Sequence, residues 1–156
     1  MRSSSFRKIV QNRRAHHDYF VEEKIEAGIV LSGSEVKALR LGQSNINDAY
    51  ADATGDELEL VNAYIPEYKG ANRFNHETRR PRKLLLRRRQ INKILGSLKK
   101  KGITLVPLSL YFNAKGRVKV ELGIVKGKKL YDKRATEKER EWNRDKARIL
   151  KGNQQD

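Results

Sequence analysis

The chain has 156 residues, 37% of them hydrophobic and 35% charged, and its 35 Lys and Arg residues outnumber 19 Asp and Glu residues to give a formal net charge of +16. This length suits one modest domain with a tail, and the large positive charge favours a polyanionic partner, either nucleic acid or an anionic membrane. No apolar run approaches the ~20 residues of a membrane-spanning helix. The N-terminus lacks the apolar segment of a secretory signal, so we expect a cytoplasmic protein without membrane contact.

The first 65 residues have the patterns of a strand, a short helix and a hairpin. Tyr19–Leu31 is rich in β-branched and aromatic residues and predicts a strand. Ser34–Leu41 opens with a potential N-cap and closes before Gly42, which predicts a short helix. Alternating patterns over residues 46–53 and 57–64, on either side of a turn containing glycine, predict a hairpin.

The second half predicts one helix and another hairpin. Lys83–Leu86 fits a short strand or the lead-in to a helix. An amphipathic helix stopping at Gly102 is indicated by apolar residues at positions i, i+3, i+4 and i+7, namely Ile91, Ile94, Leu95 and Leu98. Ile103–Phe112 and Arg117–Val125 flank a second turn and predict the second hairpin.

These elements predict a mainly β protein with two helices and at least five antiparallel strands. A small closed antiparallel barrel, similar to an OB fold, is the first choice, and a β-sandwich is the second. We assign residues 1–125 to this barrel and residues 126–156 to a basic C-terminal tail. The sizeable apolar residues of the tail are Leu130, Tyr131, Trp142, Ile149 and Leu150. They are too few to build a core, so we expect the tail to be disordered alone and to fold on a partner.

The charges are segregated along the chain. Residues 78–120 contain 14 Lys and Arg residues and no acid, whereas residues 48–67 contain six acids and no base. A block of one sign inside a folded region predicts one positively charged face, the electrostatic pattern of nucleic-acid binding. The alternative is a solvated charged surface without a partner.

Catalytic and metal-binding motifs are missing from the sequence. There is no cysteine, and His16, His17 and His76 lack the spacing of a metal site. Phosphate-loop and nucleophile-elbow motifs are also absent. We therefore expect no enzyme activity, no metal and no cofactor, and an RNA-modifying or RNA-cleaving enzyme is the less favoured alternative.

Six motifs in collinear order resemble the SsrA-binding protein family, also called small protein B. They are N-R-R-A-H-H-D-Y-F at 12–20, E-A-G-I-V-L-S-G-S-E-V-K-A-L-R at 26–40, N-I-N-D-A-Y at 45–50, R-K-L-L-L at 82–86, L-V-P-L-S-L-Y-F at 105–112 and G-K-K-L-Y-D-K-R at 127–134. The resemblance covers nearly the whole chain. It leaves a general basic OB-like ribosomal or RNA-chaperone protein as the rival interpretation.

The resemblance implies an OB-fold barrel that binds the tRNA-like domain of transfer-messenger RNA (tmRNA). It implies a non-enzymatic protein, which we expect to be a monomer, that delivers alanyl-tmRNA to stalled ribosomes together with elongation factor Tu and GTP. It also implies that the tail enters the empty decoding site and mRNA channel along ribosomal RNA and becomes helical there. Translation then resumes on tmRNA, and the incomplete product is tagged.

The resemblance also implies a set of RNA-binding residues. Glu26 matches the RNA-contacting acid of the family. From the sequence alone, a salt bridge to a neighbouring Lys or Arg side chain would be the simpler interpretation of this acid. One leucine of the strand-like triplet should point outward, and we choose Leu85, for which a core position is the alternative. Arg87 stands where the family commonly has His or Asn. The residues that match the N-terminal RNA-binding motif are Asn12, Arg14 and His17. The residues expected to contact phosphates are Lys83, Arg88 and Arg89.

Further assignments concern the tail and the aromatic residues. In the tail, ribosome-binding candidates are Gly127, Lys128, Lys129, Tyr131, Asp132, Lys133, Arg134, Trp142, Ile149 and Leu150. Five aromatic residues are expected in the barrel core instead of on a stacking surface: Tyr19, Tyr50, Tyr64, Tyr111 and Phe112.

Overall fold

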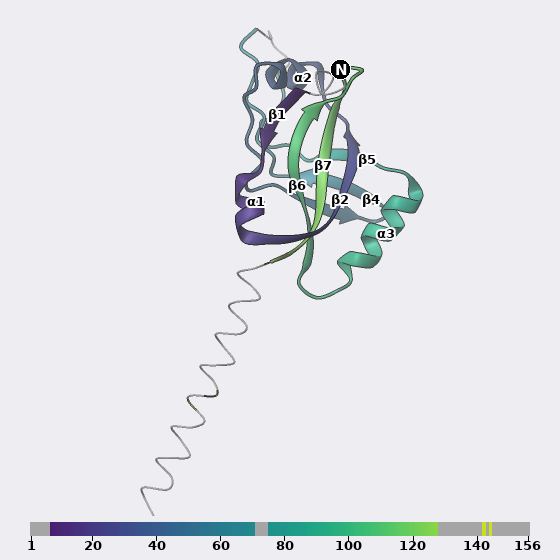
Figure 1. Cartoon of the computed structure of the whole chain (residues 1–156). Helices are drawn as coiled ribbons and strands as arrows, with labels where there is room; N and C mark the ends of the chain where they lie inside the picture. Colours follow the sequence, from purple (N-terminus) through teal and green to yellow (C-terminus); the bar gives the residue numbers. More distant parts are fainter. Residues whose placement is uncertain (1–6, 71–74, 128–141, 143, 145–156) are drawn as a thin grey trace, which may run out of the picture.

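The computed structural model describes residues 7–70, 75–127, 142 and 144, and it consists of a curved antiparallel sheet with three short helices (Figure 1). Its strands are β1 (Arg7–Gln11), β2 (Tyr19–Ile29), β3 (Tyr50–Thr54), β4 (Glu57–Val61), β5 (Arg82–Leu85), β6 (Ile103–Phe112) and β7 (Val118–Gly127). Its helices are α1 (Arg13–Asp18), α2 (Gly33–Arg40) and α3 (Arg88–Leu98). The prediction of a mainly β fold with two hairpins is confirmed.

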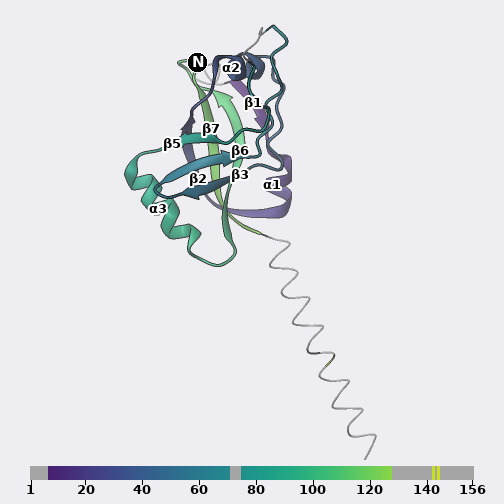
Figure 2. The same cartoon turned by 180° about the vertical axis from the view of Figure 1, so that it is seen from behind.

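The sheet bends where β2 passes from one group of strands to the other. The strand order is β1-β6-β7-β2-β5-β4-β3. β2 pairs with β7 along most of its length, but it pairs with β5 only through Gly28 and Ile29, opposite Leu85 and Leu84. As a result, β3 and β4 cross behind the long strands β2, β6 and β7 in Figure 1 and in front of them in Figure 2.

The expectation of a closed barrel is wrong in one respect, because the ladder of backbone hydrogen bonds is open. β3, at one end of the strand order, lies next to β6. Both edges of β6 already pair, one with β1 and the other with β7. β3 therefore meets β6 through side chains, and within the described residues no ladder joins the two ends of the sheet.

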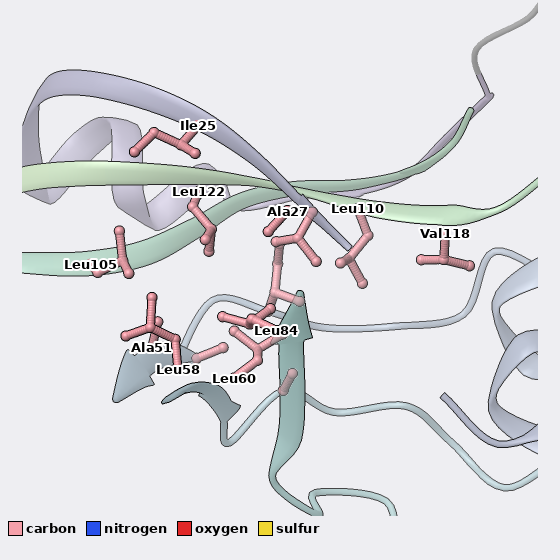
Figure 3. Packing of buried hydrophobic residues seen from close by; sticks show 14 of the residues in the cluster. Ile25, Ala27, Ala51, Leu58, Leu60, Leu84, Leu105, Leu110, Val118 and Leu122 are labelled. Atoms are coloured by element: carbon pink, nitrogen blue, oxygen red, sulfur yellow. The ribbon is translucent and has the colours of Figure 1, made fainter. Parts of the chain in front are cut away.

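The main core fills the space between the two groups of strands (Figure 3). Side chains of β2, β6 and β7, such as Ile25, Leu105 and Leu122, face Leu58 and Leu84 of β4 and β5. Alternation places these residues on the inner face and their polar neighbours outside. Burying a leucine completely stabilises the fold by about 1.5–3 kcal/mol, so this cluster supplies much of the driving force for folding.

A second, smaller cluster lies under α1. It consists of Ala15, Val106, Leu108 and Val125. The pairing of β6 with β7 shifts register between Pro107 and Ser109, and Leu108 packs close to Gly123, where an added Cβ would lie 2.9 Å from the leucine side chain. This glycine therefore permits the packing that holds α1.

The helices differ from the sequence expectation in their number and at their ends. α1 was not predicted; Asn12 caps it by accepting the Ala15 N–H through its side-chain oxygen at 2.9 Å. α2 is capped by Ser32, not Ser34, in a capping box with Glu35. α3 follows the predicted periodicity with Ile94 fully buried, but it ends at Leu98, before Gly102.

The aromatic expectation is only partly met, since Phe112 is buried but Tyr50 is 45% exposed. Tyr50 begins β3, where its side chain alternates with that of buried Ala51 and so points away from the core. None of the helices among the described residues is long and apolar enough to cross a membrane.

A buried ionic cluster joins α2 to β5 and to the segment that precedes it. Arg82 and Glu35 are both fully buried, and the Arg82 Nε donates to the Glu35 carboxylate. Arg80 also donates to Glu35, at 2.5 Å, and the Ser32 N–H does so at 2.8 Å. Arg82 further donates to the carbonyl oxygens of Ala63 at 2.8 Å and Thr78 at 3.2 Å.

The cluster keeps its charges in the protein interior. Burial disfavours the charged form of Glu35, but hydrogen bonds from Arg80, Ser32 and Arg82 outweigh this effect and lower the pKa of the carboxyl below its ordinary value. His76 is buried beside this region; its Nε2 lies 2.8 Å from the Ile65 carbonyl oxygen and its Nδ1 lies 2.9 Å from the Ser34 hydroxyl. Both ring nitrogens of His76 are thus used within the fold.

Replacing Glu35 with glutamine should destabilise the protein by about 3–5 kcal/mol, because it leaves Arg82 buried without a counter-charge. The matched change Glu57→Gln removes a carboxylate from an exposed 3.0 Å ion pair with Lys83 and should cost less than about 1 kcal/mol. Urea unfolding at pH 7 measures both values. Equal costs would contradict the importance of the buried cluster.

The cost of Glu35→Gln should also depend on pH. Since the folded pKa of Glu35 is lowered, the stability it contributes is fully present above the unfolded carboxyl pKa of about 4.3 and is lost as the pH falls through the folded value. The stability difference between wild type and Glu35→Gln should therefore narrow at low pH, as measured by urea midpoints between pH 7 and pH 3.

Candidate nucleic-acid interface

The outer face of β2, β7 and β6 presents two neighbouring rows of side chains. In the first row Glu26 lies opposite Glu121, which lies opposite Ser109. In the second row Gly28 lies opposite Lys119, which lies opposite Tyr111. Alternation explains why all these residues share the outer face while Ile25 and Ala27 are buried below them.

A surface groove with a volume of about 710 Å³ runs from these rows to the start of α3. We call it the β2–α3 groove. It is predominantly basic, with Glu23 and Glu26 as its acidic groups and Lys24, Arg87, Lys93 and Lys119 as its basic ones. Lys93 donates to Glu23 at 2.5 Å, which leaves Glu26 as the carboxylate among the remaining cations of the groove. This arrangement attracts phosphates while offering one acceptor for a hydrogen-bond donor.

Leu85 supplies an apolar surface in the β2–α3 groove. It is 50% exposed, whereas the preceding Leu84 is only 2% exposed, so the prediction that one leucine of the triplet points outward is confirmed. Leu85 packs against Gly28, where an added Cβ would lie 3.2 Å from the leucine Cβ. An exposed leucine beside cations can pack on a base or a ribose while the cations hold the backbone.

Other predicted phosphate contacts are occupied by carboxylates. Lys83 pairs with Glu57 at 3.0 Å, and Arg88 pairs with Asp56 at 3.3 Å. Both acids belong to the acidic stretch 48–67, which the fold places beside the basic block. Together with the burial of Arg82, this corrects the expectation that the whole block forms one positive face. Arg89 is exposed at the start of α3.

The predicted N-terminal residues do not join this groove, because α1 and α3 lie on opposite sides of the long strands (Figures 1 and 2). Asn12 is only 2% exposed, and its side-chain amide donates to the carbonyl oxygens of Ile46 and Pro107. The structure thus gives Asn12 a structural role in place of the predicted surface contact. Arg14 pairs with Asp48, and the His17 Nδ1 lies 2.9 Å from the Asp18 carboxylate.

Several residues of the β2–α3 groove were not predicted from the sequence. Lys24 could have been found from alternation, because it lies two residues before Glu26 on the same strand. Lys119 and Tyr111 depend on the register between strands, which local patterns do not determine. Lys93 lies within the predicted helix, but its partner Glu23 is 70 residues away in sequence.

Tyr111, expected in the core, is half-buried on the outer face. Its hydroxyl donates a hydrogen bond to Oε2 of Glu26. Burial, followed by this hydrogen bond and by the negative charges of Glu26 and Glu121, raises the pKa of Tyr111 well above its ordinary value. The phenol therefore remains a hydrogen-bond donor throughout the physiological pH range.

Most of the predicted tail site lies outside the described residues. Gly127 is the last residue of β7, so strand structure extends two residues past the boundary assigned at 125. Trp142 is 59% exposed. Residues 128–134, Ile149 and Leu150 lie outside the described part. Within the described part, no group of three His, Cys, Asp or Glu residues is arranged to hold a metal ion.

Comparison with known proteins gives a consistent set of relatives. The family model for SmpB protein matches residues 9–152. An SsrA-binding protein of Methylobacterium sp. (strain 4-46) is 59% identical over 145 residues, which are 93% of this chain and 92% of the relative. An SsrA-binding protein of Caulobacter vibrioides is 59% identical over 148 residues, covering 95% and 97% of the two chains.

A solved structure described as "tmRNA-SmpB: a journey to the center of the bacterial ribosome" has the same fold. It aligns with a TM-score of 0.66 and 46% sequence identity, covering 76% of this chain and 83% of the other. The matched family region includes every strand from β2 to β7 and all three helices. The chain therefore belongs to the SmpB protein family.

Proposed function

We propose that this protein binds the tRNA-like domain of tmRNA through the β2–α3 groove and acts with it in trans-translation on stalled ribosomes. The observation that carries this proposal is the combination, in one groove, of Glu26 as an acceptor, Leu85 as an exposed apolar contact and several cations. The relatives named as SsrA-binding proteins support it. So does the solved relative, whose description joins SmpB to tmRNA and the bacterial ribosome.

The chemistry of the groove suits folded RNA better than a small substrate. Structured RNA is recognised largely through its shape, its phosphates and its 2′-hydroxyls. Cations along β2, β7 and α3 can track a phosphate backbone, whereas Glu26 can accept from a base amino group or a 2′-hydroxyl. The role is one of binding, and no step of it requires a metal or a cofactor.

Within this proposal, the barrel and the tail have separate roles. The barrel holds the tRNA-like domain, and residues 126–156 occupy the decoding site and mRNA channel that a truncated message leaves empty. Delivery of alanyl-tmRNA with elongation factor Tu and GTP, in the cytoplasm, belongs to the same proposal. A general basic ribosomal or RNA-chaperone protein is the less favoured function, because the family match and the single acidic acceptor favour a specific RNA.

Competition binding tests the proposed function directly. Full-length protein should bind the isolated tRNA-like domain of tmRNA much more tightly than an elongator tRNA at the same salt concentration. A general basic RNA-binding protein would hold both RNAs with similar affinity, because its attraction to phosphates is independent of sequence.

Arg87→Gln should weaken the salt dependence of tmRNA binding, because Arg87 is an exposed cation of the β2–α3 groove. The slope of log K against log salt should fall by about one for the loss of one phosphate contact. Lys37→Gln removes the same charge from α2, outside the groove, and should leave the slope unchanged. Equal slopes for both variants would show that only net charge matters.

Glu26→Gln should weaken binding to the tRNA-like domain and reduce its preference over elongator tRNA, because an acceptor is lost from the groove. Glu22→Gln removes the same charge from an exposed position on the same strand and serves as the matched control. If Glu26 merely repels phosphates, both variants should bind RNA as well as or better than wild type. Affinities for the two RNAs at one salt concentration decide between these possibilities.

Alanine at Asp132, Lys133 and Arg134 should strongly reduce tagging on stalled ribosomes while leaving tmRNA affinity nearly intact. The reason is that the proposed tail contacts ribosomal RNA, while the barrel holds tmRNA. Replacing Lys146 and Arg148 with alanine removes two positive charges from the same tail and should cost much less. Equal tagging by the two variants would indicate a tail that contributes only nonspecific attraction.

A further inference from the structure

Tyr111 lies on β6, two strands away from Glu26 on β2, and its side chain reaches across β7. Two inter-strand spacings separate β6 from β2 by about 9.5 Å, and a tyrosine with a glutamate can span this distance. Lys8 and Lys119 lie opposite Tyr111 on the neighbouring strands. The hydroxyl is directed at Oε2 of Glu26.

At the position of Glu26, the carboxylate needs a contact such as that with the Tyr111 hydroxyl to keep a defined orientation. Glu121 lies directly opposite Glu26, and like charges at opposed positions repel each other. A glutamate on an exposed strand also has several rotamers of similar energy. Without a partner, its carboxylate would turn away from Glu121 into any open direction, including directions outside the β2–α3 groove.

Glu26 also stands where two surface hollows meet. It lines the β2–α3 groove together with Leu85 and Lys119, and it lines a second hollow of about 500 Å³ together with Ser109, Tyr111 and Glu121. The Tyr111 hydroxyl binds Oε2 from the side of the second hollow. Among the described residues no protein donor binds Oε1, so this oxygen is available to a ligand in the groove.

We propose that Tyr111 is a positioning residue for RNA recognition, which fixes Glu26 so that one carboxylate oxygen faces the β2–α3 groove as a single acceptor. This inference rests on the proposed function of the groove. It defines the recognised group as one hydrogen-bond donor, such as a base amino group or a 2′-hydroxyl, held beside Leu85. A bidentate pairing of Glu26 with two donors of one base would require Oε2 to accept a second hydrogen bond beside the one from Tyr111.

Tyr111→Phe tests this role because it removes the hydroxyl and keeps the ring. The matched control is Tyr64→Phe, since the contacts of Tyr64 use its backbone and its ring, which lies 5.3 Å from the Arg79 guanidinium. Tyr111→Phe should weaken binding of full-length protein to the tRNA-like domain of tmRNA by about tenfold, as expected for loss of a hydrogen bond to a charged group. Its affinity for elongator tRNA should change by less than about twofold.

A double variant separates positioning from a general effect on the fold. In the Glu26→Ala background, Tyr111→Phe should alter tmRNA affinity by less than about twofold, because the hydroxyl then has no acceptor at position 26 to orient. A merely structural tyrosine would lower the affinity for both RNAs in either background. That pattern, or full discrimination by the single Tyr111→Phe variant, would overturn the proposal.

A measurement on the free protein is independent of RNA binding. The carboxyl carbon resonance of Glu26 should shift in Tyr111→Phe and remain in place in Tyr64→Phe. An unchanged resonance in Tyr111→Phe means that the contact is absent in solution, and the positioning role is then wrong. If the resonance shifts but wild type does not prefer tmRNA over elongator tRNA, the proposed function fails, and the recognition role of the contact fails with it.

Discussion

The carboxylate of Glu35 sits without solvent exposure between the guanidinium groups of Arg82 and Arg80, and the position of the groove depends on it. Arg82 is the first residue of β5, whose last residue is Leu85. Anchoring Arg82 to α2 and to the carbonyl oxygens of Ala63 and Thr78 therefore determines where β5 lies against β2. Only two residue pairs join β5 to β2, so the strands alone would hold this corner weakly.

This anchoring connects the interior of the protein to the proposed RNA-binding surface. From Arg82 the chain alternates between inside and outside, with Arg82 and Leu84 buried and Lys83 and Leu85 exposed. Arg87 follows as the N-cap residue of α3. A shift of one residue at Arg82 would exchange the two faces and turn Leu85 inward. The buried charges thus set the register of β5 and with it the outward direction of Leu85. An apolar residue at position 82 would leave this register less defined.

Local patterns predicted much of the fold, because strand alternation and helical periodicity are properties of neighbouring residues. Both hairpins and the apolar face around Ile94 were found in this way. The short helix α1 was missed because its six residues contain two histidines and no periodic apolar face, although Asn12 before it is a good N-cap. The open end of the sheet was also missed, since it depends on β6 already having two partners.

The candidate site was predictable only where one strand carries it. Leu85 and Glu26 were placed correctly on the surface because alternation and the family motif both refer to single strands. The roles of Arg82 and Tyr111 depend on partners 47 and 85 residues away. Asn12 shows the opposite error: a residue in a shared motif was interpreted as an RNA contact, whereas its amide is used within the fold.

The ion pairs between the β3–β4 hairpin and the basic block affect how strongly the net charge of +16 attracts RNA. Asp56 and Glu57 act as permanently attached counterions for Arg88 and Lys83. A mobile salt ion is released when phosphate arrives, and its dilution into solution favours binding. A tethered carboxylate gains no such entropy when phosphate displaces it. It also stays next to the cation, where it continues to compete with the phosphate. The hairpin thereby weakens adsorption to arbitrary polyanions, while leaving the cations beside Glu26 and Leu85 exposed to an RNA of the right shape.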